Sequence, residues 1–155
     1  MTNEELMRRA IALSEESVRK GGGPFGAVIA RNGMIVAEAS NSVTLDNDPT
    51  AHAEVNAIRL ACHREKTFHL KGCDIFCSCE PCPMCLGAIY WAGLDRIYYA
   101  NNRQDAGAIG FDDDFIYQEI ATPMDRRRKP ITMMLREEAL RAFRMWMEKT
   151  DKEEY

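Results

Sequence analysis

The chain has 155 residues, of which 46% are hydrophobic and 28% charged, a size and composition typical of one globular domain with a buried core. Its 20 basic and 24 acidic residues give a net charge of -4, so we do not expect the broad basic surface of a nucleic-acid-binding protein. No run of about 18 apolar residues is present, and the first residues, MTNEELMRR, lack the apolar core of a signal peptide. We therefore expect neither membrane insertion nor secretion, but a cytoplasmic protein.

The hydrophobic pattern predicts alternating helices and strands. In chain order these are a helix from residue 2 to the glycines at 21–23, strands over 26–30 and 34–37, a helix over 49–63, a strand over 73–77, a helix over 82–91, a strand over 96–100, a loop over 101–114, a strand over 131–135 and a helix over 138–147. Thr2 and Glu5 fit a capping box, and Asp48 is expected to cap the second helix. Asn32-Gly33 suits a tight type I′ turn.

The central elements follow the order strand, helix, strand, helix, strand. Two such units need right-handed crossovers and a locally parallel sheet. Both helices then begin over the carboxyl ends of the strands, where open sheets bind their ligands. We expect the chemistry of this α/β fold to lie at that edge.

Two short motifs stand at the starts of these two helices: HAE at 52–54 and PCPMC at 81–85. His52, Cys82 and Cys85 make a three-ligand set for Zn²⁺, and a helix N-terminus favours thiolates. In a regular helix His52 and Glu54 would diverge by about 200°, so both can reach one centre only if it lies off the helix end.

Glu54 decides what the site does. As a fourth ligand it would close a structural zinc cage, whereas as a non-ligand it leaves a position for water and stands ready to accept that water's proton. The order H-x-E followed by P-C-x-x-C resembles the signature of zinc deaminases of nucleobases. The motif therefore favours an enzyme, and a structural zinc-binding module remains the alternative outside enzymes.

The remaining candidates are interpreted more simply. Cys79 extends the run to C-x-x-C-x-x-C, which leaves an iron-sulfur cluster as an alternative, although no fourth cysteine follows. Small buried or surface roles are expected for Cys62, Cys73, Cys77, His63 and His69. The basic run Arg126 to Lys129 is expected to be a solvated loop.

Nearly end to end, the chain resembles the bacterial guanine deaminases of the cytidine deaminase superfamily. The residues that carry this resemblance are GGPFGAVI, NDPTAHAEV, SCEPCPMCLGAIYWA, GFDD, FIYQEI and the terminal KEEY. The resemblance implies a single three-layer α/β/α domain over 1–155, with a mixed and roughly five-stranded sheet. It also implies one Zn²⁺ per chain, held by His52, Cys82 and Cys85.

The same resemblance implies where a purine base binds. The implied substrate contacts are Phe25, Asn41, the Ala53 backbone, Trp91, Asp113 and Tyr155, with Asp113 touching both the base and its departing amine. From local sequence alone, Asp112, Asp113 and Asp114 are equally well interpreted as a solvated acidic loop.

The implied reaction is hydrolytic deamination of guanine at C2, in which Glu54 carries the water's proton to N3 and then to the amine. Guanosine deaminase is the next alternative, followed by tRNA adenosine and cytosine deaminases. The resemblance further implies a homodimer whose C-terminal tail, residues 149–155, is exchanged so that Tyr155 covers the partner's site.

Overall fold

The computed structural model describes residues 1–155, and the chain divides into two compact units, Met1–Asp114 and Phe115–Tyr155. Each unit is described by itself. No helix in either unit is long and apolar enough to cross a membrane.

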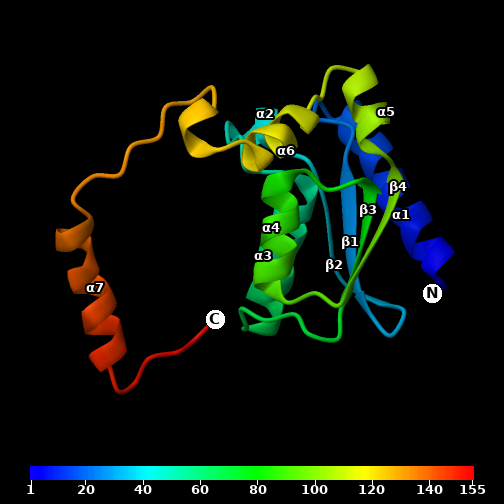
Figure 1. The fold of residues 1–155 in the computed structure, drawn as a ribbon. Helices are drawn as coiled ribbons and strands as arrows, with labels where there is room; N and C mark the ends of the chain where they lie inside the picture. The colour runs from blue at the N-terminus through cyan, green and yellow to red at the C-terminus, as the bar shows by residue number, and fades with distance from the viewer. The chain divides into compact units, whose positions relative to one another are not determined.

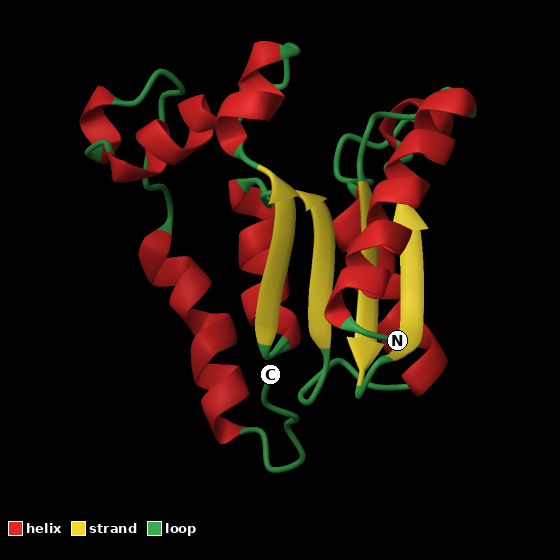
Figure 2. Cartoon of the chain, turned by 90° about the vertical axis from the view of Figure 1, so that its right-hand side faces the viewer, coloured by secondary structure: helices red, strands yellow, loops and turns green.

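The first unit has three layers, with a sheet between helices (Figures 1 and 2). Its elements are α1 (Asn3–Arg19), β1 (Gly26–Arg31), β2 (Met34–Ser40), α2 (Val43–Asp46), α3 (Ala53–Glu65), β3 (Asp74–Cys79), α4 (Pro83–Ala92), β4 (Arg96–Asn101) and α5 (Arg103–Ala108). Helix α1 covers one face of the sheet, while α3 and α4 pack against each other on the opposite face. The expected three-layer α/β fold is confirmed.

The sheet is mixed, with strand order β2-β1-β3-β4. Strand β1 runs antiparallel to both neighbours, pairing Ile29 with Ala37 of β2 and with Ile75 of β3, whereas β3 and β4 are parallel. The expected fifth strand is wrong, because residues 131–135 have no regular secondary structure and pair with no other strand. An apolar run can predict a strand, but only a paired neighbour makes it one.

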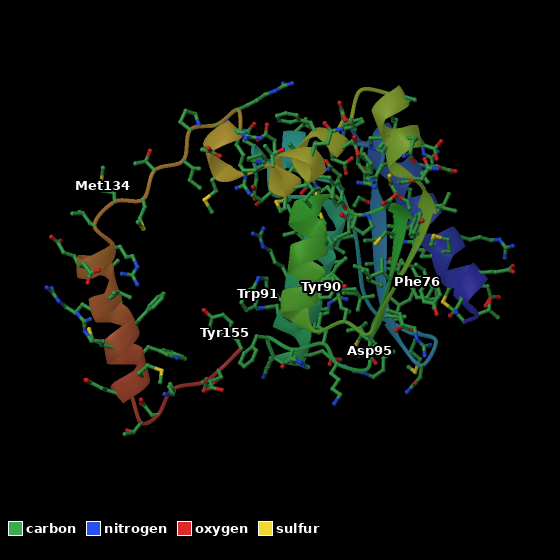
Figure 3. All side chains as sticks on the ribbon, in the orientation of Figure 1. Phe76, Tyr90, Trp91, Asp95, Met134 and Tyr155 are labelled. Carbon is green, nitrogen blue, oxygen red and sulfur yellow. The ribbon has the colours of Figure 1, made fainter.

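The two faces of the sheet are both apolar, which explains the continuous burial of β1. Ala27 and Ile29 belong to the core against α3 and α4, and Val28 and Ala30 to the core against α1. Phe76 of β3, labelled in Figure 3, is buried on the α1 side. Its ring stacks on that of Tyr98 at a centroid distance of 4.7 Å. This double cover holds the strand ends, and so the site, on a rigid base.

Several predicted helix and turn signals are confirmed. Thr2 and Glu5 form the capping box of α1. Helix α4 begins after Cys82 and ends at Gly93, whose φ of 69° is suited to glycine. In the hairpin turn, Asn32 and Gly33 have φ values of 51° and 77°, the positive angles that a type I′ turn needs.

The expected start of the second helix at Pro49 is wrong. Asp48 Oδ1 instead accepts hydrogen bonds from the Thr50 backbone N–H at 2.8 Å and the Thr50 hydroxyl at 2.7 Å, which closes a turn. Helix α3 begins at Ala53, and His52, with an extended backbone at φ -72° and ψ 153°, is its N-cap. The difference matters because His52 now lies off the helix end.

The expected loop over 101–114 is also only partly right. It contains α5, which starts with a capping box in which Asn102 Oδ1 accepts from the Asp105 N–H at 2.9 Å. The sequence contained a signal for this helix, because Asn102 and Asp105 have the spacing of a capping box. Residues 109–113, which include Asp113, have no regular structure and follow this helix directly.

The second unit contains a short 3-10 turn (Met124–Arg126) and α7 (Arg136–Glu148), preceded by α6 (Asp114–Ala121), whose first residue closes the first unit. Two residues of the basic run contact α6 or the residue that follows it. Arg127 Nε donates to the Thr122 carbonyl at 2.9 Å, and the Arg128 guanidinium lies over the Phe115 ring at 4.6 Å. No residue from 115 to 155 is buried.

Candidate metal centre and active site

Three potential metal ligands meet at the N-terminal ends of α3 and α4. His52 Nδ1 lies 3.5 Å from Cys82 Sγ and 3.4 Å from Cys85 Sγ, and the three donor atoms all lie within 4.8 Å of one another. A tetrahedral zinc ion, with Zn–S bonds of about 2.3 Å and Zn–N bonds of about 2.0–2.1 Å, holds sulfur and nitrogen about 3.5 Å apart. The predicted donor set is therefore brought together with spacings that fit Zn²⁺.

The convergence follows from the roles of these residues in their helices. His52 and Cys82 are both N-caps with extended backbones, so neither is constrained to the helical direction. Cys85 lies in the first turn of α4 and donates its backbone N–H to Cys82 Sγ at 3.5 Å. A helix N-terminus carries partial positive charge, which favours thiolate ligands.

In the absence of a metal, the two cysteines of the site have very different pKa values. A hydrogen bond from Cys85, opposed by burial, lowers the pKa of Cys82 to about 4. That same bond, together with burial, holds the pKa of Cys85 well above its usual range. The hydrogen bond to Cys82 raises the pKa of His52. Without a metal the pair thus keeps one proton, and a divalent cation replaces it.

Glu54 is in the first turn of α3 and is only 5% exposed. Burial raises the pKa of its carboxyl to about 7, against a hydrogen bond with Cys85 that lowers it. Glu54 is not among the three residues whose donor atoms cluster. The arrangement thus has three ligands and an adjacent buried acid, the pattern of a catalytic zinc site rather than a closed structural cage.

Cys79 does not join the metal cluster. It ends β3, is 7% exposed, and its Sγ lies 3.9 Å from the Asn102 carbonyl oxygen. Burial raises its pKa to about 11, so it stays a neutral thiol. Since the donor group contains one histidine and two cysteines, the iron-sulfur alternative is not supported. Cys73 and Cys77 lie in the hydrophobic core, as expected.

The GFDD segment lies against Phe25. The ring of Phe111 meets the Phe25 ring edge to face, with centroids 5.0 Å apart and an interplanar angle of 89°. Asp113 carries a buried Oδ1 without a hydrogen-bond partner. Burial and the nearby charge of Cys82 raise the pKa of its carboxyl, and Arg103 opposes the rise. A buried carboxylate oxygen left unpaired is costly, so it is a natural acceptor for a ligand's N–H groups.

The three aspartates of this segment have different surroundings. Asp112 is exposed, whereas Asp114 pairs with Arg103 at 3.5 Å. Only Asp113 among them presents a buried, unpartnered oxygen. The environment therefore distinguishes residues that the sequence alone left equivalent.

Asn41 is 7% exposed, and its carboxamide oxygen is already engaged. Asn41 Oδ1 accepts the backbone N–H groups of Val43 at 3.1 Å and Gly23 at 3.4 Å. The amide nitrogen, with two donors, is the part of the side chain suited to a ligand acceptor. Ala53, fully buried, opens α3, where first-turn N–H groups lack intrahelical partners.

One predicted substrate contact, Trp91, lies at the opposite end of α4 from the metal ligands. Trp91 lies in the last turn of α4 beside Tyr90 and is 71% exposed (Figure 3). It is nine residues after Cys82, which a helical rise of about 1.5 Å per residue converts to about 13 Å. Tyr155 belongs to the second unit and is 84% exposed.

Sequence reasoning missed two residues next to these groups. Phe111 was not singled out, although its place within GFDD was a signal, and Arg103 was assigned to a loop. Arg103 Nε lies 3.2 Å from Glu80 Oε2, and Arg103 Nη1 lies 3.5 Å from Asp114 Oδ1. No local pattern indicated that pairing, because Glu80 lies 23 residues away.

Comparison with known proteins agrees with this geometry. The model of the cytidine and deoxycytidylate deaminase zinc-binding region matches residues 1–101. A guanine deaminase from Bacillus subtilis is 49% identical over 156 residues, with both chains fully covered. The X-ray structure of guanine deaminase from Bacillus subtilis has a TM-score of 0.96, covering 100% of this chain and 99% of that one.

Another relative is similar over part of the chain. A tRNA-specific adenosine deaminase from Aquifex aeolicus is 37% identical over 100 residues, covering 64% of this chain and 66% of the relative. Within this chain, the metal donors and Glu54 lie inside the region of residues 1–101, whereas Asp113 and Tyr155 lie beyond it. Two of the six expected substrate contacts are thus outside the matched region.

Proposed function

This chain belongs to the cytidine and deoxycytidylate deaminase family, and from this membership we propose that it is a zinc-dependent guanine deaminase. It hydrolyses guanine with water to give xanthine and ammonia. The observation that carries the proposal is Glu54, a buried carboxyl that lies beside a three-donor zinc site without belonging to the donor set. Full-length similarity to a guanine deaminase supports the choice of substrate.

His52, Cys82 and Cys85 hold the zinc ion, since their donor atoms have the spacing and charge that Zn²⁺ prefers. When bound, zinc supplies an activated water at neutral pH, because coordination lowers the pKa of water to about 7. The chain's own residues then direct that water and its protons.

Glu54 is the proton carrier. Its carboxyl takes a proton from the attacking water and delivers it to N3 of guanine as the bond from oxygen to C2 forms. It then takes the remaining proton of the C2 hydroxyl and passes it to the amine, so that the C2–N bond breaks, ammonia leaves and the C2 carbonyl of xanthine forms. Because burial raises its pKa to about 7, Glu54 can both accept and return a proton near neutral pH. One positioned group therefore acts in both halves of the reaction.

The base is recognised by stacking and by complementary polar groups. Phe25, backed by Phe111, offers an aromatic surface to the planar ring. The Asn41 amide nitrogen and the backbone at Ala53 donate to acceptors of the base. Asp113 Oδ1 accepts from N1–H and the 2-amino group, a pair of donors that guanine has and adenine lacks on that edge. Trp91 and Tyr155 complete the proposed substrate contacts.

Ammonia release tests the assignment across guanine, guanosine, adenine, cytosine and a tRNA anticodon stem-loop, using protein that contains one zinc per chain. Guanine should be deaminated with the highest kcat/KM. Release from the nucleoside but not from the free base would instead assign guanosine deaminase, and release only from the stem-loop would assign a tRNA adenosine deaminase. A net charge of -4 does not favour RNA binding.

We further propose that both units belong to one domain that works as a cytoplasmic homodimer, with residues 149–155 exchanged between subunits. Helix α7 supports the need for a partner, because Phe143 and Met147 on its apolar face are 71% and 72% exposed. Free cysteines, including two ligands that must stay reduced, suit a reducing compartment.

Subunit complementation tests the exchange. A Glu54→Gln chain with its tail and a chain truncated after residue 148 with Glu54 intact should both be inactive. Mixed dimers refolded from the two should regain activity, because the intact tail of one covers the intact Glu54 site of the other. Mixed dimers that form but remain inactive would refute the exchange.

A further inference from the structure

The short segment 111–114, which carries Asp113, contacts the rest of the first unit at both of its ends. At its start, Phe111 packs on Phe25 and donates its backbone N–H to the Ala106 carbonyl at 3.0 Å. At its end, Asp114 Oδ1 lies 3.5 Å from Arg103 Nη1. Asp113 therefore sits between an aromatic contact and an ionic one.

Arg103 links this segment to the loop that precedes the metal ligands. Its Nε lies 3.2 Å from Glu80 Oε2, and its backbone N–H donates to Glu80 Oε1 at 3.1 Å. Glu80 in turn lies between Cys79, the last residue of β3, and the ligand Cys82, and donates its N–H to the Asn101 carbonyl at 2.7 Å. Both connections form where β3 and β4 end and α5 begins (Figure 1).

A guanidinium suits this position. It is planar and presents several N–H donors in fixed directions, so one arginine can hold two carboxylates at a set separation. The Arg103 side chain is 31% exposed, and those of Glu80 and Asp114 are 25% and 48% exposed. The three groups form a bridge between the metal-binding loop and the Asp113 segment.

We propose that Arg103 is a positioning residue for base recognition: by bridging Glu80 and Asp114 it sets the distance between Asp113 and the metal centre. The inference rests on the proposed function, in which Asp113 contacts the base. A misplacement of about 1 Å can cost about 100-fold in rate, so a residue that touches no substrate can still govern catalysis.

The experiment compares Arg103→Gln, Arg103→Lys and the control Arg8→Gln, which removes the exposed ion pair between Arg8 and Glu4 of α1. Arg103→Gln should lower kcat/KM for guanine by about 10- to 100-fold, with a raised KM and unchanged zinc content. Arg103→Lys should recover part of the loss, since it keeps the charge but not the two-sided geometry. Arg8→Gln should behave as the unmodified protein.

A double-mutant cycle with Asp113→Asn separates positioning from general support. If Arg103 acts through Asp113, Arg103→Gln should have little further effect in the Asp113→Asn background. Additive losses in the cycle, or a kcat/KM of Arg103→Gln within about twofold of the unmodified protein, would overturn the inference. Should Arg103→Gln lose zinc or fail to fold, Asp114→Asn breaks only the second half of the bridge and decides by the same criteria.

Amide hydrogen exchange provides a readout that needs no substrate. Residues 110–114 should exchange faster in Arg103→Gln than in Arg8→Gln, while β1 and β3 remain protected. Unchanged exchange over 110–114 would overturn the inference even if the protein proved to act on another base. Absence of guanine deamination by the unmodified protein would instead refute the proposed function, leaving the exchange result to decide on Arg103.

Discussion

Replacing Glu54 by glutamine should lower the rate of deamination at least about 100-fold and, in the metal-free protein, stabilise the fold. Glutamine keeps the shape of the side chain and its capacity for hydrogen bonds, but it can neither accept nor release a proton. The substitution therefore removes the proposed proton transfer without opening a cavity in the first turn of α3, where Glu54 is only 5% exposed.

The expected loss of activity follows from the role of a positioned acid and base. Such a group contributes about 10² to 10⁴ in rate, so kcat should fall by at least about 100-fold. Zinc should stay at one ion per chain, since Glu54 is outside the cluster of donor atoms.

The expected gain in stability follows from the cost of burying a charge. The pKa of Glu54 is raised by burial from 4.5 to about 7. The ionised carboxylate is thus disfavoured in the folded protein, and the cost grows from pH 4.5 to about pH 7 and then stays constant. At about 1.4 kcal/mol per pKa unit, it reaches about 3 kcal/mol.

Urea unfolding of the metal-free proteins at pH 4.5 and pH 8 measures this difference. Glu54→Gln should unfold at higher urea than the unmodified protein at pH 8, and at nearly the same concentration at pH 4.5. Glu4→Gln, which changes an exposed glutamate, serves as the control. Equal stability at pH 8, or full activity with zinc retained, would refute the reasoning about Glu54.

Three further outcomes are expected. Cys82→Ser should lower bound zinc and abolish ammonia release while the circular dichroism of the fold is largely kept, whereas unfolding on zinc loss would indicate a structural site. Glu38→Gln should cost about 1 kcal/mol at pH 7, because Arg9 holds that carboxylate at 2.7 and 2.8 Å. Arg9 also lowers the pKa of Glu38, so in urea unfolding the difference should persist above about pH 4.5 and vanish as the pH falls further. Gly26→Ala should destabilise by more than about 2 kcal/mol in the same assay, since a Cβ there would overlap the backbone carbonyl oxygen of Ala10; a smaller loss would mean that α1 can move away.

Local patterns were sufficient for much of the fold. The capping box at Thr2, the Asn32-Gly33 turn and the helix predicted over 82–91 depend on residues close in sequence, and each is confirmed. The predicted strand at 131–135 failed because a strand depends on a partner that local sequence does not specify. The start of α3 was misplaced because Asp48 can cap a turn as readily as a helix.

The sequence by itself determined the chemistry: the order of His52, Glu54, Cys82 and Cys85 indicated a zinc site with a proton carrier, since few functions need those residue types at those spacings. Only the tertiary structure decided that Glu54 lies outside the donor set, that Asp113 rather than its neighbours has a buried, unpaired oxygen, and that Arg103 joins Glu80 to Asp114. The physical reason is that burial and long-range ion pairs arise from how the strand ends and helix starts converge, and that convergence is a property of the packed layers rather than of any short stretch of chain.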